Sequence, residues 1–148
     1  MADHFQTGVD TSPGRLLVAH PKAAPSMFAR SVVLLTEHNP NGHRGFILNK
    51  RIDMTLRDIA RQHGMDIISD RSLYQGGPLQ PHALTLLHSH EWYSSNTFPV
   101  AGQFHLSSDH LMMEKMQLGD VPRELRALAG WSGWKPGQLE NEIARGDW

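Results

Sequence analysis

The sequence contains no cysteine, and this absence removes several kinds of chemistry at once. Without thiols the chain has no disulfide framework, no thiolate nucleophile and no sulfur-ligated zinc site. A cysteine-free composition fits a reducing compartment, so we expect a cytoplasmic protein.

An excess of one charge and long apolar runs are also lacking. The chain has 14 basic and 15 acidic side chains, for a formal net charge of −1. Phosphate backbones and anionic lipids are bound by clustered Lys and Arg, so composition indicates neither partner. The longest apolar runs, 31–36 and 45–48, are far below the ~20 residues that span a bilayer. The polar start of the chain does not resemble a signal peptide.

What remains is the composition of a globular protein. Hydrophobic residues make up 39% of 148 residues, enough for one domain with its own core. We expect a flexible N-terminal segment over residues 1–13 and a single domain over residues 14–148.

The clearest strand pattern lies at residues 31–38, a β-branched and aliphatic run with polar ends. Asn39-Pro40-Asn41-Gly42 follows with turn chemistry, and residues 45–49 return as a second apolar run. An antiparallel hairpin over 31–49 is therefore predicted. Further predicted strands cover 14–20, 72–75, 83–88 and 103–106.

Three helices are predicted between and after these strands. The first covers 55–64, with Thr55 as N-cap, Asp58 three residues later and Gly64 as the C-terminal stop. The second runs from Ser108, its expected N-cap, to residue 117. Its expected inward side chains are Leu111, Met112 and Met116. The third covers 136–144. Hairpin strands interspersed with helices indicate the α+β class.

Histidine is the first candidate for chemistry, because the chain has ten. His88 and His90 alternate in a strand-like segment, and His38 and His43 flank the hairpin turn. A hydrolase or metal-dependent enzyme using His38, His88 or His90 would need three such groups, or a carboxylate partner, within reach. Scattered histidines with ordinary hydrogen bonds are the alternative. Nucleophile-elbow and phosphate-binding motifs are absent.

Residues 55–71 resemble a degenerate helix-turn-helix, with Arg57, Arg61 and Arg71 nearby. The second helix would cover 66–74, but Asp70 stands where an apolar contact is needed, and few side chains there suit base edges. One core-packing helix followed by a loop is favoured over a DNA-binding unit.

Residues 130–140 pack glycines, a proline and two indoles into a short stretch. Glycine beside an indole indicates a backbone that passes close to a large flat side chain. The stretch therefore forms either a rigid corner of the core or a wall on which a ligand stacks, and the corner is favoured.

Taken together, these segments resemble the YqgE/AlgH family of bacterial proteins, also labelled UPF0301. Order and spacing of the motifs hold from about residue 14 to the last residue. The segments that carry the resemblance are 16–21, 28–33, 37–39, 42–50, 76–78, 86–88, 133–143 and Trp148.

The resemblance implies an α+β fold whose bent, mainly antiparallel sheet forms a partial barrel with a few flanking helices. It also implies a strand at 126–129, where composition alone favours a helix. His43, Arg44 and Arg51 depart from the family pattern and make the hairpin tip more cationic. Family members usually continue past the position of Trp148, so we expect part of the usual core to be missing, replaced, or supplied by a partner such as a second copy.

The polar and glycine residues in the family motifs form no reaction machinery, so we expect a non-enzymatic binding or regulatory protein. A role in transcription, particularly of alginate production, rests on the resemblance alone. No catalytic residue, metal or cofactor is predicted, and the partner is an unidentified protein or small molecule. Direct DNA binding stays open, although the charge does not support it. Polar and glycine residues at strand ends are predicted either to converge on a small surface pocket or to cap strands; they are Arg30, Ser31, His38, Asn49, Gly76, Gly77 and Gln138.

Overall fold

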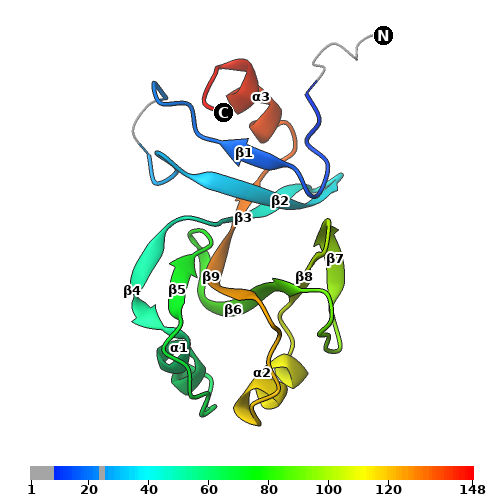
Figure 1. Ribbon diagram of the computed structural model, residues 1–148. Coiled ribbons are helices and arrows are strands. Elements are labelled where there is room, and N and C mark those ends of the chain that lie inside the picture. Colours follow the sequence, from blue (N-terminus) through cyan, green and yellow to red (C-terminus); the bar gives the residue numbers. More distant parts are fainter. Residues whose placement is uncertain (1–8, 24–25) are drawn as a thin grey trace.

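The structure is a computed structural model that describes residues 9–23 and 26–148 (Figure 1). Strands dominate, and helices follow the fourth, eighth and ninth strands. In chain order the elements are β1 (Leu16–Val18), β2 (Val32–Asn39), β3 (Gly42–Ile47), β4 (Arg51–Thr55), α1 (Leu56–Gln62), β5 (Ser72–Gln75), β6 (Leu79–Ser89), β7 (Phe98–Ala101), β8 (Phe104–Ser107), α2 (His110–Gln117), β9 (Leu125–Trp134) and α3 (Gln138–Ala144).

The strands form one strongly curled sheet with the shape of a half-barrel. Its order is β1-β2-β3-β9-β6-β8-β7, with β5 also paired to β9 and β4 paired to β5. Neighbouring strands are antiparallel except for β5 and β9, which are parallel. The predicted α+β class, with a bent and mainly antiparallel sheet, is confirmed.

The predicted hairpin is formed by β2 and β3. Asn39 pairs with Gly42 at the turn, and the register extends to Val33 opposite Ile47. Gly42 has φ 115°, and a Cβ there would overlap the carbonyl oxygen of Trp134 in β9. Only glycine satisfies both the left-handed backbone and this close approach, so the turn also sets how the hairpin docks on β9.

Helix α1 begins as predicted at the Thr55 cap. The Thr55 hydroxyl accepts from the Asp58 N–H, and the Asp58 carboxylate accepts from the Thr55 N–H, which completes a capping box. After α1, residues 63–71 have no regular structure and lead into β5, as expected from the favoured interpretation of one core-packing helix followed by a loop. Ile67 is 2% exposed and packs in the core instead of presenting a recognition surface.

Helix α2 differs from its prediction in two details. Its N-cap is Asp109 rather than Ser108, since the Asp109 carboxylate accepts from the Met112 N–H at 2.8 Å. Leu111, predicted to face inward, is 39% exposed, while Met112, Met113 and Met116 are buried. The buried face thus includes Met113 in place of Leu111 and is centred one residue later than predicted.

Strand β9 covers the segment where composition favoured a helix. Ala127 pairs with Leu73 of β5 on one side and with Leu86 of β6 on the other. Two hydrogen-bonded neighbours outweigh the helix propensity of an Ala- and Leu-rich segment. The strand predicted from the family resemblance is confirmed.

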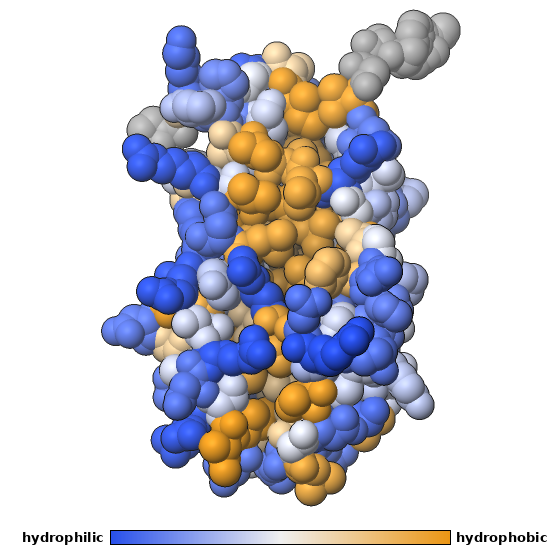
Figure 2. All heavy atoms as spheres, in the orientation of Figure 1, coloured by the Kyte–Doolittle hydropathy of each residue, from blue (hydrophilic) through white to orange (hydrophobic). Residues whose placement is uncertain are grey.

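The core has three clusters of buried apolar residues. One lies beneath α1 and α2, a second joins α3 to the hairpin, and the third lies within the curl of the sheet. Apolar side chains also reach the surface, where Figure 2 shows an apolar area over the centre of the upper half of one face, bordered by polar groups, and smaller apolar patches below it. No helix in the described ranges is long and apolar enough to cross a membrane.

The predicted flexible segment, 1–13, lies mostly outside the described residues, which begin at Val9. Within residues 9–13, Asp10 forms an ion pair with Arg15 at 2.7 Å. Thr11 is buried, and its hydroxyl lies 3.0 Å from His43 Nε2. This part of the segment therefore contributes to the packed molecule.

Candidate functional site

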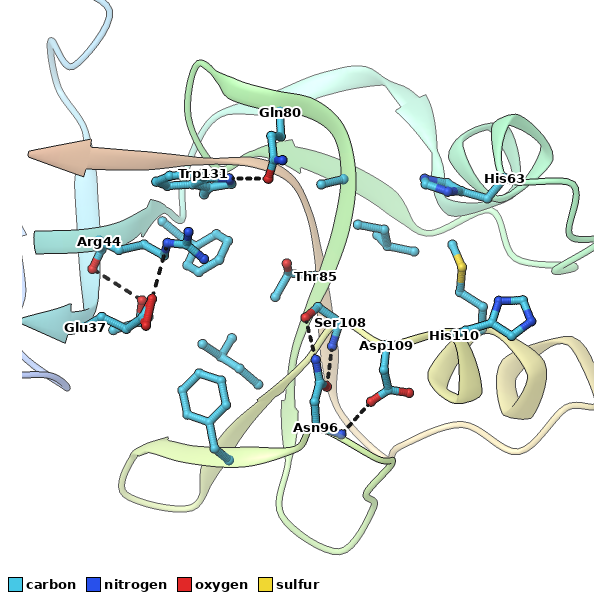
Figure 3. A pocket seen from close by; sticks show the side chains of 17 residues that line it. Glu37, Arg44, His63, Gln80, Thr85, Asn96, Ser108, Asp109, His110 and Trp131 are labelled. Atoms are coloured by element: carbon cyan, nitrogen blue, oxygen red, sulfur yellow. Dashed lines mark hydrogen bonds and ion pairs between the residues drawn. The ribbon is translucent and has the colours of Figure 1, made fainter. Parts of the chain in front are cut away.

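A large cavity lies in the curl of the sheet, with a volume of about 670 Å³. Its walls come from β2, β3, β6, β8, β9 and the start of α2 (Figure 3). Elements far apart in sequence meet there because the sheet bends back on itself.

The cavity combines an apolar floor with polar walls. Phe46, Leu84 and Leu106 are buried core residues whose side chains also line it. The polar and titratable lining residues are Thr36, Glu37, Arg44, His63, Gln80, Thr85, Asn96, Ser108, Asp109 and His110.

One wall of the cavity is built around the indole of Trp131 and is held by three polar contacts. The Arg44 guanidinium lies 3.7 Å from the centre of the Trp131 ring, and its Nε is 3.3 Å from Glu37 Oε1. Trp131 Nε1 donates to Gln80 Oε1 at 2.9 Å. A Cβ at Gly133 would come within 3.0 Å of the same ring, so the glycine lets the indole lie against the strand. The arrangement fixes a cation and an anion side by side at the cavity (Figure 3).

The opposite wall is built around Asp109. Burial acts to raise the pKa of this carboxyl, but hydrogen bonds from Ser94 Oγ and from the N–H groups of Asn96 and Met112 outweigh it and lower the pKa. Asn96 and Ser108 are joined by two further hydrogen bonds, of 2.9 and 3.0 Å. Asp109 is thus an ionised helix cap that accepts three hydrogen bonds. Its carboxylate holds this wall in place and is not suited to take up a proton.

Behind this wall, His88 belongs to a buried hydrogen-bond network that solvent does not reach. Its Nδ1–H donates to the Ser89 carbonyl at 2.9 Å, which leaves Nε2 to accept from Ser107 Oγ at 2.7 Å. Thr97 Oγ1 lies 2.6 Å from the same Ser107 oxygen. His88 is 0% and Ser107 1% exposed, so this serine–histidine pair has no access for a substrate.

A separate cluster joins the hairpin tip to α3. One possible metal-ligand atom from each of His38, His43 and Glu140 lies within 4.8 Å of the other two. Burial and then the neighbouring His38 lower the pKa of His43, against an opposing effect of Glu140. Among the described residues this is the one group of three such side chains close enough to hold a metal ion.

A sequence model of the AlgH-like family matches residues 16–148. The chain belongs to the AlgH-like family. It is 38% identical to a UPF0301 protein of Methylococcus capsulatus over 142 residues, which are 94% of this chain and 78% of that protein. A UPF0301 protein of Chlamydia felis is 35% identical over 135 residues, covering 91% and 71%.

Solved structures agree with this assignment. The solution structure of the AlgH protein from Pseudomonas aeruginosa has a TM-score of 0.79 and 26% identity, covering all of this chain and 79% of that one. Protein DIP2367 from Corynebacterium diphtheriae has a TM-score of 0.75 and 28% identity, covering 95% and 75%. The half-barrel is thus shared with two solved proteins.

The site residues predicted for this AlgH-like chain fall into separate places, and none lines the large cavity. Arg30, Ser31 and Asn49 come together where β2 begins and β3 ends. Asn49 Nδ2 donates to the Arg30 carbonyl at 3.0 Å, and its Oδ1 accepts from the Val32 N–H at 3.0 Å. Ser31 Oγ donates to the Phe28 carbonyl at 2.6 Å. These side chains satisfy backbone groups at the strand ends.

Gly76 and Gly77 lie against β9 instead. The Gly76 N–H donates to the Ala129 carbonyl at 2.8 Å, and a Cβ on either glycine would overlap the β9 backbone. Gln138 starts α3, where its Oε1 accepts from the Lys135 N–H at 3.0 Å. His38 belongs to the hairpin-tip cluster. Ligand binding by this set stays a prediction.

The three histidines named as possible catalytic or metal-binding groups lie in three different surroundings. His38 has two ligand-type neighbours, His43 and Glu140, whereas His88 lies in the core network and His90 has a ring contact with His105 at 6.3 Å. Sequence reasoning missed Glu140 because it lies about a hundred residues from the hairpin. It missed the Glu37–Arg44–Trp131 wall for the same reason, although the cationic departure at Arg44 was a signal.

Proposed function

We propose that this AlgH-like protein is a non-enzymatic binding protein that holds a small organic ligand in the cavity of the half-barrel. The cavity carries the proposal: its volume of about 670 Å³ falls within the range of about 300–1,000 Å³ of ligand pockets. An apolar floor with a few fixed polar groups is also typical of such pockets.

The lining supports a ligand with an apolar body and polar ends. Arg44 and Glu37 offer one charge of each sign, and Asp109 is already engaged by three hydrogen bonds. An uncharged or zwitterionic molecule of the size of a nucleoside or an amino-acid derivative matches this balance, because it leaves no large net charge uncompensated.

The same lining supports binding rather than bond-making. Of the two lining histidines, His63 Nε2 bonds the His82 carbonyl and His110 faces Glu114 at 3.7 Å. Among the described residues, neither ring hydrogen-bonds a lining hydroxyl, so neither histidine is placed to activate one as a nucleophile.

A regulatory role, including one in transcription, rests on the family resemblance. Because residues 63–71, directly after α1, form no recognition helix, such a role would act through a protein partner that senses the loaded cavity. We also propose that residues 14–148 act as one domain, which the family match over 16–148 supports, and that the protein is cytoplasmic, on the cysteine-free composition alone.

The test is a thermal-stabilisation screen with nucleosides and zwitterionic amino-acid derivatives. A ligand at 100 times its Kd adds about 2.7 kcal/mol to the free energy of unfolding, which is easily measured as a rise in Tm. For a compound that binds, Arg44→Gln should weaken affinity about 10-fold to 100-fold, because a hydrogen bond to a charged group contributes about 1.5–3 kcal/mol.

A blocking variant and a matched control locate the binding site. Ala83 lines the cavity, so Ala83→Trp fills it and should abolish binding. Leu118 is 84% exposed and does not line the cavity, so Leu118→Trp adds an indole elsewhere and should leave binding intact. A compound that binds Ala83→Trp as well as wild type, or a screen in which no compound raises Tm, argues against the proposal.

A further inference from the structure

The cluster at the hairpin tip contains two imidazoles and a carboxylate on different elements. His38 is the penultimate residue of β2 and His43 is the second residue of β3, and the two are paired across the hairpin. Glu140 lies in α3, which packs on this hairpin. One possible ligand atom from each side chain lies within 4.8 Å of the other two.

Two polar atoms of this cluster are buried without a hydrogen-bond partner in the described residues. They are His43 Nδ1 and Glu140 Oε1. His43 is 5% exposed, so water does not readily satisfy its ring nitrogen. Buried polar atoms in folded proteins are normally paired, so two unpaired metal-ligating atoms in one cluster indicate a site that suits an ion.

The second nitrogen of His43 is held as metal ligands usually are. His43 Nε2 lies 3.0 Å from Thr11 Oγ1, and Thr11 is itself buried. Histidines that bind metals generally donate the other ring N–H to such a partner, which fixes the tautomer and the ring plane. A proton on Nε2 leaves the Nδ1 lone pair free inside the cluster.

We propose that His38, His43 and Glu140 bind a divalent transition-metal ion, with Zn²⁺ as the best match. Two imidazoles and one carboxylate form a known donor set for zinc, which leaves a fourth position for water. The ion would join the hairpin to α3 and satisfy both unpaired atoms.

The metal-free geometry requires a small adjustment before it binds. The rings of His38 and His43 stack with their centres 3.8 Å apart and their planes inclined by 11°. Lone pairs in parallel planes do not converge on one ion, so one ring has to turn. His38 is exposed and free to do so, while His43 is held by Thr11.

The experiment uses the full chain after treatment with a chelator. Zn²⁺ titration followed by calorimetry should show one saturable site, and Co²⁺ should produce the visible absorption of a low-coordinate complex. His43→Gln and Glu140→Gln should each weaken Zn²⁺ binding about 100-fold or more, because even the hydrogen-bond partners of ligands contribute 10–100-fold.

Two further variants make the result decisive. His38→Gln changes an exposed side chain and should fold normally, yet it should also lose the Co²⁺ absorption. His110→Gln removes an exposed histidine that faces Glu114 at 3.7 Å, and it should bind Zn²⁺ like wild type. Absence of saturable binding by the wild type overturns the proposal. So does binding that survives both His38→Gln and Glu140→Gln, or binding that His110→Gln reduces equally.

Discussion

His88 occupies a position where protonation works against folding. Its ring is fully buried, donates to the Ser89 carbonyl and accepts from Ser107, and packs edge-on against Trp92 with ring centres 5.1 Å apart. Burial lowers the pKa of His88 below its ordinary 6.5, and His105 acts in the same direction, while the Ser89 hydrogen bond and Glu91 oppose them. The folded protein therefore keeps this imidazole neutral.

This produces a pH dependence of stability with a definite sign. Above pH 6.5, His88 is neutral in both the folded and the unfolded chain, and its contribution is fully present. As the pH falls below 6.5, the unfolded chain takes up the proton first, so the free energy of unfolding decreases until the folded-state pKa is passed. One proton gives a slope of at most about 1.4 kcal/mol per pH unit.

We therefore expect urea denaturation between pH 7 and pH 5 to show a shallower loss of stability in His88→Gln than in wild type. Leu87→Ala changes the neighbouring residue of β6 without removing a titrating group. It should lower the whole stability curve and leave its slope unchanged. Parallel curves for wild type and His88→Gln would contradict the argument.

Residue roles of this kind depend on contacts that the sequence does not contain. The histidines at 38, 43 and 88 were visible as candidates, but nothing local distinguishes the buried His88, bonded to Ser107, from the exposed His90. Glu140 became a candidate ligand only when α3 was placed on the hairpin. The residue type limits which reactions or ligands a side chain can support. The tertiary contacts then determine which of these possibilities are accessible in the folded protein.

At the scale of elements, helix α3 is held to the sheet by a carboxylate between two indoles. Glu142 Oε1 accepts from Trp134 Nε1 at 3.0 Å and from Trp148 Nε1 at 2.8 Å. Its Oε2 accepts from Gln138 Nε2 at 3.1 Å. Trp134 and Trp148 also pack around Phe28, with ring centres 5.6–6.2 Å apart. The glycine–tryptophan stretch predicted from the sequence thus ends in a corner of the core.

Glu142→Ala should lower the free energy of unfolding by about 2–3 kcal/mol, because it leaves two partly buried indole N–H groups without their acceptor. Glu142→Gln keeps one acceptor oxygen and should cost about half as much. Equilibrium denaturation measures both. Glu114→Ala removes an exposed carboxylate of α2 and should stay within about 0.5 kcal/mol of wild type. If Glu142→Ala were as mild, the corner would not depend on this carboxylate.

Elements with strong local patterns were predictable, and weak edge elements were not. The hairpin and α1 carry their own turn and capping residues, so both were found. Strands β4 and β7 were missed. Strand β7 is an edge strand with Pro99 in its interior, a residue that suits only such edges and weakens the sequence pattern. The register of the strands that form the cavity walls could not be predicted, because it depends on pairing between strands that are far apart in the sequence.

At the scale of the molecule, β9 is the strand on which the other parts depend. It pairs with β3 near its C-terminal end and with both β5 and β6 along its first half. Its Leu128 is fully buried in the cluster within the curl. Strand β3 of the hairpin, β6 of the cavity wall and β5 all pair directly with this one segment. It cannot open without separating them.

Native-state hydrogen exchange should therefore be slowest in β9. Amides of residues 127–129 are flanked by a strand on each side, so their exchange should require global unfolding and follow the full free energy measured by denaturant. Strands β1 and β7 lie at the two ends of the sheet, each with one neighbour, and should exchange through local opening at a lower free energy. Equal protection of β9 and β7 would mean that the half-barrel opens as one unit.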